Sequence, residues 1–455
     1  MRVLQAGCTA LEAVEAAIKV LEDKEIANAG FGSNLAIDGT VECDATIVDH
    51  LGRSGAVGAV SNIKNPVSLA SLVLEHSRRP LSLRRVPPNL LVGEGARDFA
   101  TEHGMPLVPN SWLVSRDARD RYLKWEQDLK RAEASGISSS PPASGATTSS
   151  TTPNSGEQDA HPGAYRDHAK AVQTGVWNEG QVDSPSLGSA RGSQPTSSQA
   201  SPLPSPGRSS IGRPPRVITG NIDKSPEHSH GHLPAGNHGG DAACDLPTIT
   251  SDSDEPLHVD TAEEVAQDLI TDTVGAIAID QDGRIAAASS SGGIGMKHRG
   301  RVGPAALVGV GTSVIPQDDS DEEGVSVAAV TSGTGEHMAT TMASQKCAER
   351  LYQWTRRGEG GADVAADDEA TILDSFICED FQKHPGVRNS TSAGAIGVMA
   401  VKKSKSGFYL YFAHNTDSFA LASMASTDRE PLCVMSRLRE NNYGVSQGAR
   451  KIHIK

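Results

Sequence analysis

The sequence has few cysteines, few aromatic residues and no long hydrophobic run. Its six cysteines are spread over 455 residues with neither a pairing pattern nor a C-x-x-C spacing (Cys8, Cys43, Cys244, Cys347, Cys378 and Cys433). This distribution predicts reduced thiols and an intracellular protein, because extracellular domains of this kind are usually cross-linked. No signal peptide and no apolar stretch long enough to cross a bilayer is recognisable. We therefore expect a protein of the cytoplasm, the nucleus or both, with no membrane partner.

Positive charge is also scarce. The chain has 42 lysines and arginines against 56 acidic residues, a net charge of −14, and its basic residues do not gather into a stripe. Nucleic-acid binding is therefore not predicted. Histidines gather at one place (His228, His230, His232 and His238), but no Cys-x-x-Cys motif accompanies them. We predict no metal site there and no cofactor elsewhere.

The middle of the chain lacks the composition of a folded domain. From about residue 132 it is dominated by Ser, Pro, Gly, Thr and His, and it has no long apolar periodicity. Such a segment cannot bury enough apolar surface to offset the entropy that ordering costs. We predict one domain in two parts, residues 1–131 and 261–455, interrupted by a disordered insert over residues 132–260.

The two parts are predicted to form one α/β domain. A helix is expected near residues 10–23, because Thr9 can cap it and apolar residues recur on one of its faces. The other helices are expected near residues 66–77, 91–103, 113–134, 336–356 and 366–383. Strands are expected near residues 34–38, 42–48, 305–312, 325–331, 394–401, 408–415 and 419–424, with a hairpin that turns at Asp282-Gly283.

The dipeptide Asp272-Thr273 opens the first strand of that hairpin. A threonine hydroxyl is a poor nucleophile without a base beside it, and the threonine's own α-amine can serve as that base. This amine exists only if the peptide bond before Thr273 is cut. The dipeptide therefore predicts a precursor that cleaves itself between Asp272 and Thr273, although a threonine that merely opens a strand is the commoner case.

Three further motifs follow Thr273 in a suggestive order. A serine-rich stretch, residues 289–293, is expected to form a flexible polar turn after the hairpin, and a basic cluster occupies residues 297–303. The turn at residues 331–336 combines hydroxyls with glycines just before a helix, where exposed backbone N–H groups suit an oxyanion. Together they predict a hydroxyl helper, a carboxylate-binding arginine and oxyanion donors for the nucleophile.

These motifs resemble the type 2 asparaginases, which are N-terminal nucleophile hydrolases. Within that family the resemblance is strongest to the threonine aspartases (taspases), proteases that cut after aspartate. The similarity runs over roughly residues 5–125 and 265–430, and it implies an αββα sandwich. Its motifs include DTVGA (272–276), SSGG (290–293), GRVG (300–303), TSGTGE (331–336), NAGFGSN (28–34), VECDA (41–45), GAVGAV (55–60), IKNPV (63–67) and LVGEGA (91–96).

The resemblance implies a role for each matching residue. Thr273 would be the nucleophile, and Ser291 would hydrogen-bond its hydroxyl. Arg301 would bind the carboxylate of the substrate aspartyl group through a bidentate fork. Ser332 and Gly333 would form the oxyanion hole. The implied partners are protein substrates with Asp before the cut and the α and β fragments of the same chain, which would assemble as a homodimer, a heterotetramer after processing.

Two departures from the family pattern separate the alternatives. Members that act on free amino acids hold the substrate's α-ammonium with an Asp three residues after the arginine, where this chain has Pro304. The departure favours an endopeptidase that cleaves after aspartate over an L-asparaginase or isoaspartyl peptidase acting on small substrates. The chain also begins close to its first helix, without the family's usual first strand. We expect a truncated gene model or a short isoform, so an inactive, protein-binding relative stays a third alternative.

Overall fold

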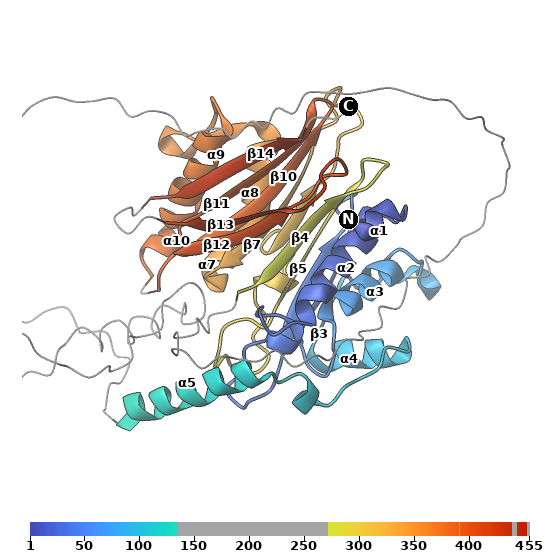
Figure 1. The fold of residues 1–455 in the computed structure, drawn as a ribbon, viewed down its shortest axis with the longest axis vertical. Helices are drawn as coiled ribbons and strands as arrows, with labels where there is room; N and C mark the ends of the chain where they lie inside the picture. Colours follow the sequence, from blue (N-terminus) through green and yellow to red (C-terminus); the bar gives the residue numbers. More distant parts are fainter. Residues whose placement is uncertain (135–271, 391, 439–443, 453–455) are drawn as a thin grey trace, which may run out of the picture. The chain divides into compact units, whose positions relative to one another are not determined.

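The structure, a computed structural model, describes residues 1–134, 272–390, 392–438 and 444–452 (Figure 1). Almost all of the predicted insert and the four clustered histidines lie outside the described residues. All of the described residues, from both parts of the sequence, belong to one compact unit. Their packing against one another can therefore be described.

The first sheet is built from both parts of the sequence. Its spatial order is β3-β2-β1-β5-β4, with only β2 and β3 parallel. Strands β1 and β5 pair through the register Asp44↔Ser291, so the end of the hairpin lies against the first part of the chain. The strands are β1 (Cys43–Val48), β2 (Ser54–Val60), β3 (Leu90–Val92), β4 (Val274–Ile279) and β5 (Ile285–Ser291).

The second sheet comes from the second part of the sequence alone. Its spatial order is β14-β11-β10-β7-β6, and all its pairs are antiparallel. Its strands are β6 (Thr312–Ile315), β7 (Ser326–Gly333), β10 (Ile396–Ser404), β11 (Gly407–His414) and β14 (Ser446–Ile452). Two small sheets accompany it, made of β8 (Thr355–Arg357) with β9 (Asp363–Ala365) and of β12 (Ser418–Ser423) with β13 (Leu432–Arg437).

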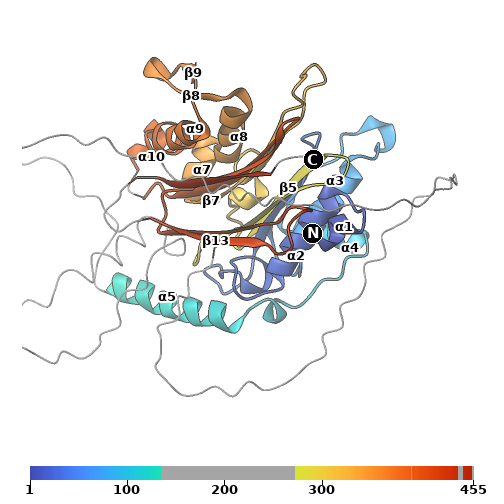
Figure 2. The same cartoon turned by 45° about the horizontal axis from the view of Figure 1, so that its top comes forward.

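The two large sheets pack face to face. Ile285 and Ala287 of β5 share a buried cluster with Ala328 and Val330 of β7. The alternate residues Ala286 and Ala288 face the other way, into the helices over the first sheet, as the two-residue period of a strand requires. The layers are visible in Figure 2. The predicted αββα sandwich is therefore confirmed.

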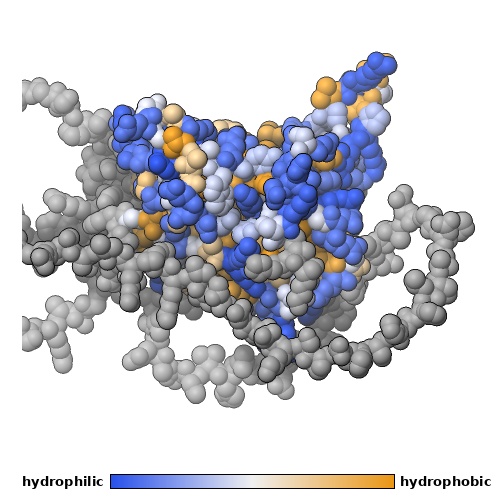
Figure 3. Space-filling model, turned by 90° about the horizontal axis from the view of Figure 1, so that it is seen from above, coloured by the Kyte–Doolittle hydropathy of each residue, from blue (hydrophilic) through white to orange (hydrophobic). Residues whose placement is uncertain are grey.

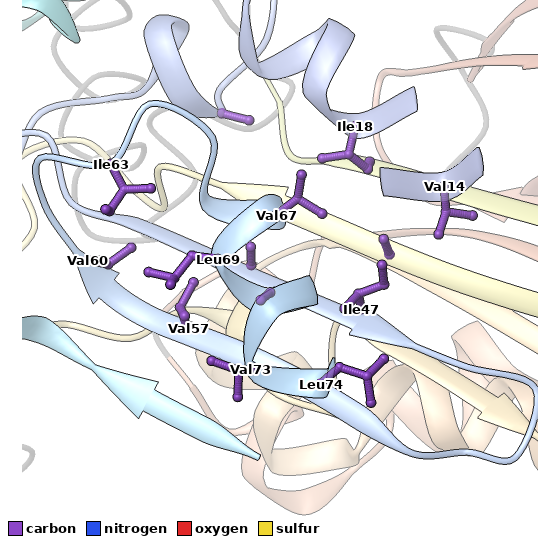
Figure 4. Packing of buried hydrophobic residues seen from close by; sticks show 14 of the residues in the cluster. Val14, Ile18, Ile47, Val57, Val60, Ile63, Val67, Leu69, Val73 and Leu74 are labelled. Carbon is purple, nitrogen blue, oxygen red and sulfur yellow. The ribbon is translucent and has the colours of Figure 1, made fainter. Parts of the chain in front are cut away.

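Helices cover both outer faces of the sandwich. Over the first sheet lie α2 (Ala10–Glu22), α3 (Pro66–Ser77) and α4 (Gly93–Glu102). Figure 4 shows apolar side chains of α2 and α3 beside those of β1 and β2. Thr9 caps α2 as predicted, with Glu12 completing a capping box. Over the second sheet lie α7 (Gly335–Thr341), α8 (Ala343–Gln353), α9 (Glu369–Ser375) and the π-helix η6 (Phe376–Gln382).

Shorter and peripheral elements complete the described chain. A long charged helix, α5, ends the first described part, as predicted. The remaining elements are α1 (Arg2–Gln5), α5 (Arg116–Ala134), α10 (Pro385–Arg388) and the 3₁₀ turns η1 (Gly30–Gly32), η2 (Ser82–Arg84), η3 (Asn110–Trp112), η4 (Pro304–Ala306) and η5 (Glu359–Gly361). On the face seen in Figure 3, hydrophobic residues are scattered among hydrophilic ones. None of the helices described here is both long enough and apolar enough to cross a membrane.

Three predicted elements differ from the structure. Residues 34–38 form isolated bridges and not a strand. The strand predicted over 305–312 is a 3₁₀ turn followed by β6, which begins only at Thr312. The helix predicted over 336–356 breaks into α7 and α8, because Met342 adopts a left-handed conformation with φ 52°. Apolar periodicity continues across that break, so the sequence pattern did not reveal it.

Candidate active site

The hydroxyl of Thr273 lies at the start of β4, the edge strand of the first sheet. Thr273 directly precedes β4, and its Oγ1 donates a hydrogen bond of 2.9 Å to Oγ of Ser291, the last residue of β5. The Gly293 N–H donates to the same Ser291 oxygen at 3.0 Å. Ser291 is buried. Its oxygen therefore accepts two hydrogen bonds and fixes the direction in which the Thr273 hydroxyl points.

The serine-rich stretch is not the flexible turn that the sequence predicts. Ser289, Ser290 and Ser291 all belong to β5 and are all buried. Strand β1 pairs with them along their whole length, and α2 and β7 pack against β5 and cover its side chains. The prediction was wrong because β5 pairs with a strand more than 200 positions away in the chain, and the stretch itself carries no sign of this.

The carbonyl of the Asp272–Thr273 peptide bond is held by a residue from the first part of the chain. The Asn28 N–H donates to the Asp272 carbonyl oxygen at 2.9 Å, and the Asn28 carbonyl accepts from Gly292 at 2.8 Å. The Asn28 side chain is buried and donates to the Gly293 carbonyl at 2.8 Å. A backbone donor on this carbonyl is suited to stabilise negative charge that develops on its oxygen. The sequence placed Asn28 in a family motif but gave it no role.

Of the predicted oxyanion pair, Ser332 contacts Asp272, through the side chain of that residue. Ser332 Oγ donates to Oδ1 of the Asp272 side chain, and the Thr273 N–H donates to the same oxygen at 2.7 Å. Gly333 belongs to β7 and pairs with Ile396. Within the described chain, the hydrogen bond that reaches the Asp272 carbonyl comes from Asn28. In the intact chain, Ser332 thus orients the Asp272 carboxyl group.

Arg301 lies in the loop that follows β5 and forms an ion pair with Glu336. Its Nε and one terminal nitrogen lie 3.0 and 2.9 Å from Oε1 of Glu336. The Arg301 side chain is 15% exposed and that of Glu336 is 64% exposed. The sequence also left open that Arg301 merely pairs with a surface acid, for example Asp318. Arg301 does pair with a surface acid, but that acid is Glu336. Arg301 already binds a carboxylate, and that carboxylate is itself open to solvent and to exchange.

Two glycines allow the chain to surround the Arg301 guanidinium. A Cβ on Gly303 would lie 2.6 Å from one of its terminal nitrogens, and a Cβ on Gly335 would lie 2.5 Å from the other. Both distances are far below van der Waals contact. Any side chain at either position would therefore displace the guanidinium. For this reason the chain passes the guanidinium with glycine at both positions.

The loop that carries Arg301 is anchored on β1 through Asp44. Asp44 is fully buried and accepts hydrogen bonds from the N–H groups of Gly303 at 2.7 Å and Ala59 at 2.8 Å. Burial raises the pKa of Asp44, and the nearby positive charges of Lys297 and Arg301 act in the opposite direction. Lys297 is also buried and donates to the Glu42 carbonyl at 2.7 Å. Both parts of the sequence thus contribute to the placement of Arg301.

A buried acid lies behind the catalytic end of the first sheet. Burial raises the pKa of Glu22, at the end of α2, to about 8, although hydrogen bonds from Ser290 and Val67 oppose the shift. The Val67 N–H donates to Glu22 Oε1 at 3.0 Å. A carboxyl with this pKa is mostly protonated at neutral pH. Within the described residues, no group of three or more His, Cys, Asp or Glu side chains is placed to hold a metal ion.

Comparison with known proteins identifies the family. The family profile described as Asparaginase matches residues 1–159 and 247–406, more than half of the chain. The chain belongs to the type 2 asparaginase family. Its members are N-terminal nucleophile hydrolases, and the αββα sandwich agrees with that assignment. The gap between the two matched segments, residues 160–246, falls inside the predicted insert.

Similar proteins within the asparaginase family share only part of their length with this chain. The isoaspartyl peptidase/L-asparaginase of Xenopus laevis is 46% identical over 123 residues, which cover 27% of this chain and 37% of the relative. The protein of the same name from Mus musculus is 41% identical over 133 residues, 29% of this chain and 38% of the relative. The Homo sapiens protein is 41% identical over 123 residues, 27% and 37% respectively. The aligned region thus spans under two fifths of each of these relatives.

Proposed function

We propose that this asparaginase-family chain is the precursor of a threonine-nucleophile hydrolase that cuts its own Asp272–Thr273 bond. The observation that carries the proposal is the arrangement around this one peptide bond. The Thr273 hydroxyl is oriented by Ser291 at 2.9 Å, and the carbonyl next to it accepts the Asn28 N–H at 2.9 Å. The attacking oxygen and the oxygen that becomes negative are both held before the reaction starts.

The proposed self-cleavage has two steps, an acyl shift to the Thr273 hydroxyl and hydrolysis of the resulting ester. Thr273 Oγ1 attacks the Asp272 carbonyl carbon and loses its proton, the Asp272–Thr273 C–N bond breaks, and the α-amine of Thr273 receives a proton. Asp272 is then joined to Thr273 Oγ1 through an ester. Water hydrolyses this ester, which leaves a carboxyl group on Asp272 and restores the hydroxyl. The freed α-amine can then act as the base for later substrates.

Arg301 supports an aspartyl substrate. Its guanidinium already holds the Glu336 carboxylate, so the site can accommodate a carboxylate at that place. Pro304 follows three residues later and begins the turn η4, where it offers no charge for the α-ammonium of a free amino acid. These features support our first candidate, an endopeptidase that cleaves selected proteins after aspartate.

The second candidate is an L-asparaginase or isoaspartyl peptidase that acts on small substrates. The names of the relatives support it, and these names favour it over the endopeptidase. Glu336 supports it too, because an exposed carboxylate beside Arg301 could bind an α-ammonium in place of the missing Asp. The inactive relative remains the alternative to both.

One set of measurements separates the three. Mass spectrometry of the purified chain, incubated in folded form, should find a fragment that begins at Thr273. A chain that stays intact for days would contradict the nucleophile assignment and favour the inactive relative. The cleaved protein is then assayed against free asparagine, a β-aspartyl dipeptide and a peptide with an internal Asp. Turnover of the internal-Asp peptide alone supports the endopeptidase, and turnover of either small substrate supports the second candidate.

A further inference from the structure

We propose that Arg121, on α5, is a positioning residue for cleavage of the Asp272–Thr273 bond. The inference rests on the proposed self-cleavage and adds a residue that lies outside the catalytic set predicted from the sequence. Arg121 does not touch the scissile bond. It acts through a short chain of hydrogen bonds that ends on the carbonyl to be attacked.

The first link joins α5 to the loop around η1. Arg121 is only 4% exposed, although most of α5 is charged and solvent-facing. Its Nε donates to Asn34 Oδ1 at 3.3 Å, and its terminal nitrogen NH2 donates to the Gly32 carbonyl at 3.1 Å. A guanidinium can donate in two fixed directions at once, so it sets the position of the loop and of the Asn34 side chain together.

The second link runs through two buried asparagines. Because Arg121 donates to the oxygen of the Asn34 amide, the nitrogen end of that amide faces the Gly293 carbonyl, to which it donates at 3.1 Å. The Asn34 N–H donates to Oδ1 of Asn28 at 2.9 Å. This bond leaves the Asn28 amide nitrogen to donate to the same Gly293 carbonyl at 2.8 Å. Each of the two side-chain amides thus has one orientation only, and Arg121 sets the orientation of the Asn34 amide.

The last link reaches the reacting atoms. Asn28 holds the Asp272 carbonyl through its N–H at 2.9 Å, and Gly293 holds Ser291 through a 3.0 Å hydrogen bond. The two partners of the proposed attack, carbonyl and hydroxyl, are therefore both tied to residues that Asn34 contacts. A shift of about 1 Å in such an arrangement can cost about 100-fold in rate. The position of Arg121 thus bears directly on the rate of self-cleavage.

Four purified variants test the proposal, with the rate of appearance of the Thr273 fragment as the measurement. Arg121→Met keeps the length of the side chain and removes the donors. Arg121→Lys keeps the charge but not the two-directional donation. Arg119→Met is the matched control, since Arg119 lies on the same helix and is exposed. Asn34→Asp keeps an acceptor for Arg121 but removes the donor to Gly293.

We expect Arg121→Met to slow self-cleavage about 10- to 100-fold, Arg121→Lys to slow it less, and Arg119→Met to leave it unchanged. Asn34→Asp should also slow it, although this variant gives Arg121 a stronger, charged partner. If Arg121 served only to hold α5 in place, Arg121→Met would lower the thermal midpoint and leave the cleavage rate of the folded protein at the wild-type value. Thermal midpoints of the uncleaved forms show whether each variant is folded.

Chemical rescue provides a readout that does not depend on substitution alone. Arg121→Ala leaves space for a guanidinium ion, and millimolar guanidinium chloride should restore part of the cleavage rate, whereas sodium chloride should not. Wild-type rates in both Arg121→Met and Asn34→Asp, with cleavage of the wild-type chain intact, would overturn the role of Arg121 and leave the proposed function standing. A wild-type chain that never cleaves would overturn both.

Discussion

The proposed cleavage centre and Arg301, the proposed substrate-binding residue, are built in opposite ways. At the cleavage centre, Ser291 and Asn28 are almost completely buried, and they hold the Thr273 hydroxyl and the Asp272 carbonyl through bonds of 2.9 Å. At the arginine, Glu336 is 64% exposed and binds Arg301 from the solvent side. Under the proposed function, the buried contacts form once, during folding, whereas the contact with Glu336 is exchanged with each substrate.

The difference has an energetic reason. Polar groups buried at the cleavage centre keep their hydrogen-bond partners, because an unpaired buried donor or acceptor costs about 1–3 kcal/mol. The Arg301–Glu336 ion pair is open to solvent at its Glu336 end, and ion pairs that water screens contribute about 1 kcal/mol or less. A substrate carboxylate can therefore displace Glu336 at small cost, whereas disturbance of Asn28 or Ser291 affects the reacting atoms themselves.

The largest effect is expected at the nucleophile. Thr273→Ala should reduce both self-cleavage and substrate hydrolysis by about 10⁴-fold or more, because the same oxygen serves both reactions. Thr273→Ser keeps a hydroxyl and should retain part of each activity. Mass spectrometry measures the first reaction and peptide assays measure the second. Full processing of the alanine variant would assign the nucleophile to another residue.

The next prediction compares two buried serines of β5 by their effect on the rate of self-cleavage. Ser291→Ala removes the acceptor for the Thr273 hydroxyl and should slow self-cleavage about 10- to 100-fold. Ser289→Ala is the control, because Ser289 is equally buried but bonds to Thr312 at 2.6 Å. It should cost stability and leave the cleavage rate nearly unchanged. Equal slowing in both variants would indicate a general packing effect.

Substitution of Arg301 tests the recognition side of the contrast. Peptides with Asp before the cut should be preferred over those with Asn, and Arg301→Ala should lower this ratio of kcat/KM about 10- to 100-fold, as expected for loss of charge-assisted hydrogen bonds. Arg301→Lys keeps the charge without the fork and should be intermediate or weak. A ratio that survives Arg301→Ala would show that another group selects aspartate.

A smaller effect, with a sign that depends on the substrate, is expected at Glu336. If the substrate carboxylate displaces Glu336, Glu336→Gln should lower KM for Asp peptides about 2- to 5-fold, the range of an exposed ion pair. If Glu336 instead holds the α-ammonium of a free amino acid, the same variant should raise KM for asparagine. Steady-state kinetics on both substrates distinguish the endopeptidase from the asparaginase. No change for either would place Glu336 outside recognition.

Substitution of Glu22 is expected to have the smallest effect on catalysis. Its main effect is expected on the pH dependence of stability. Its pKa is raised by burial from 4.5 to about 8, so the folded state binds a proton that the unfolded state releases above pH 4.5. The free energy of unfolding should therefore fall as pH rises from about 4.5 to about 8 and change little above that. Glu22→Gln should flatten this decline in denaturant titrations. A decline of the same size in the variant would assign it to another group.

Much of the fold could be predicted because its signals are local. The cap at Thr9 and the apolar face of α2 lie within 13 residues, and the Asp282-Gly283 turn determines the hairpin of β4 and β5. Strand β2 was missed, although its motif was noted, because its small residues match a turn as well as a strand. Gly55 is needed there, since a Cβ would lie 2.2 Å from the Ala70 carbonyl of α3.

The sequence by itself determined the order of the motifs, and hence the family, the place of Thr273 and, through the family resemblance, Ser291 as the partner of its hydroxyl. Only the tertiary structure decided which groups surround them. Asn28, Arg121 and Glu336 reach the site from elements far away in the chain, through bonds that depend on the pairing of β1 with β5 and on the packing of α5. Hydrogen bonds form over about 3 Å whatever the separation along the chain, so such partners leave no periodic or local signal in the sequence.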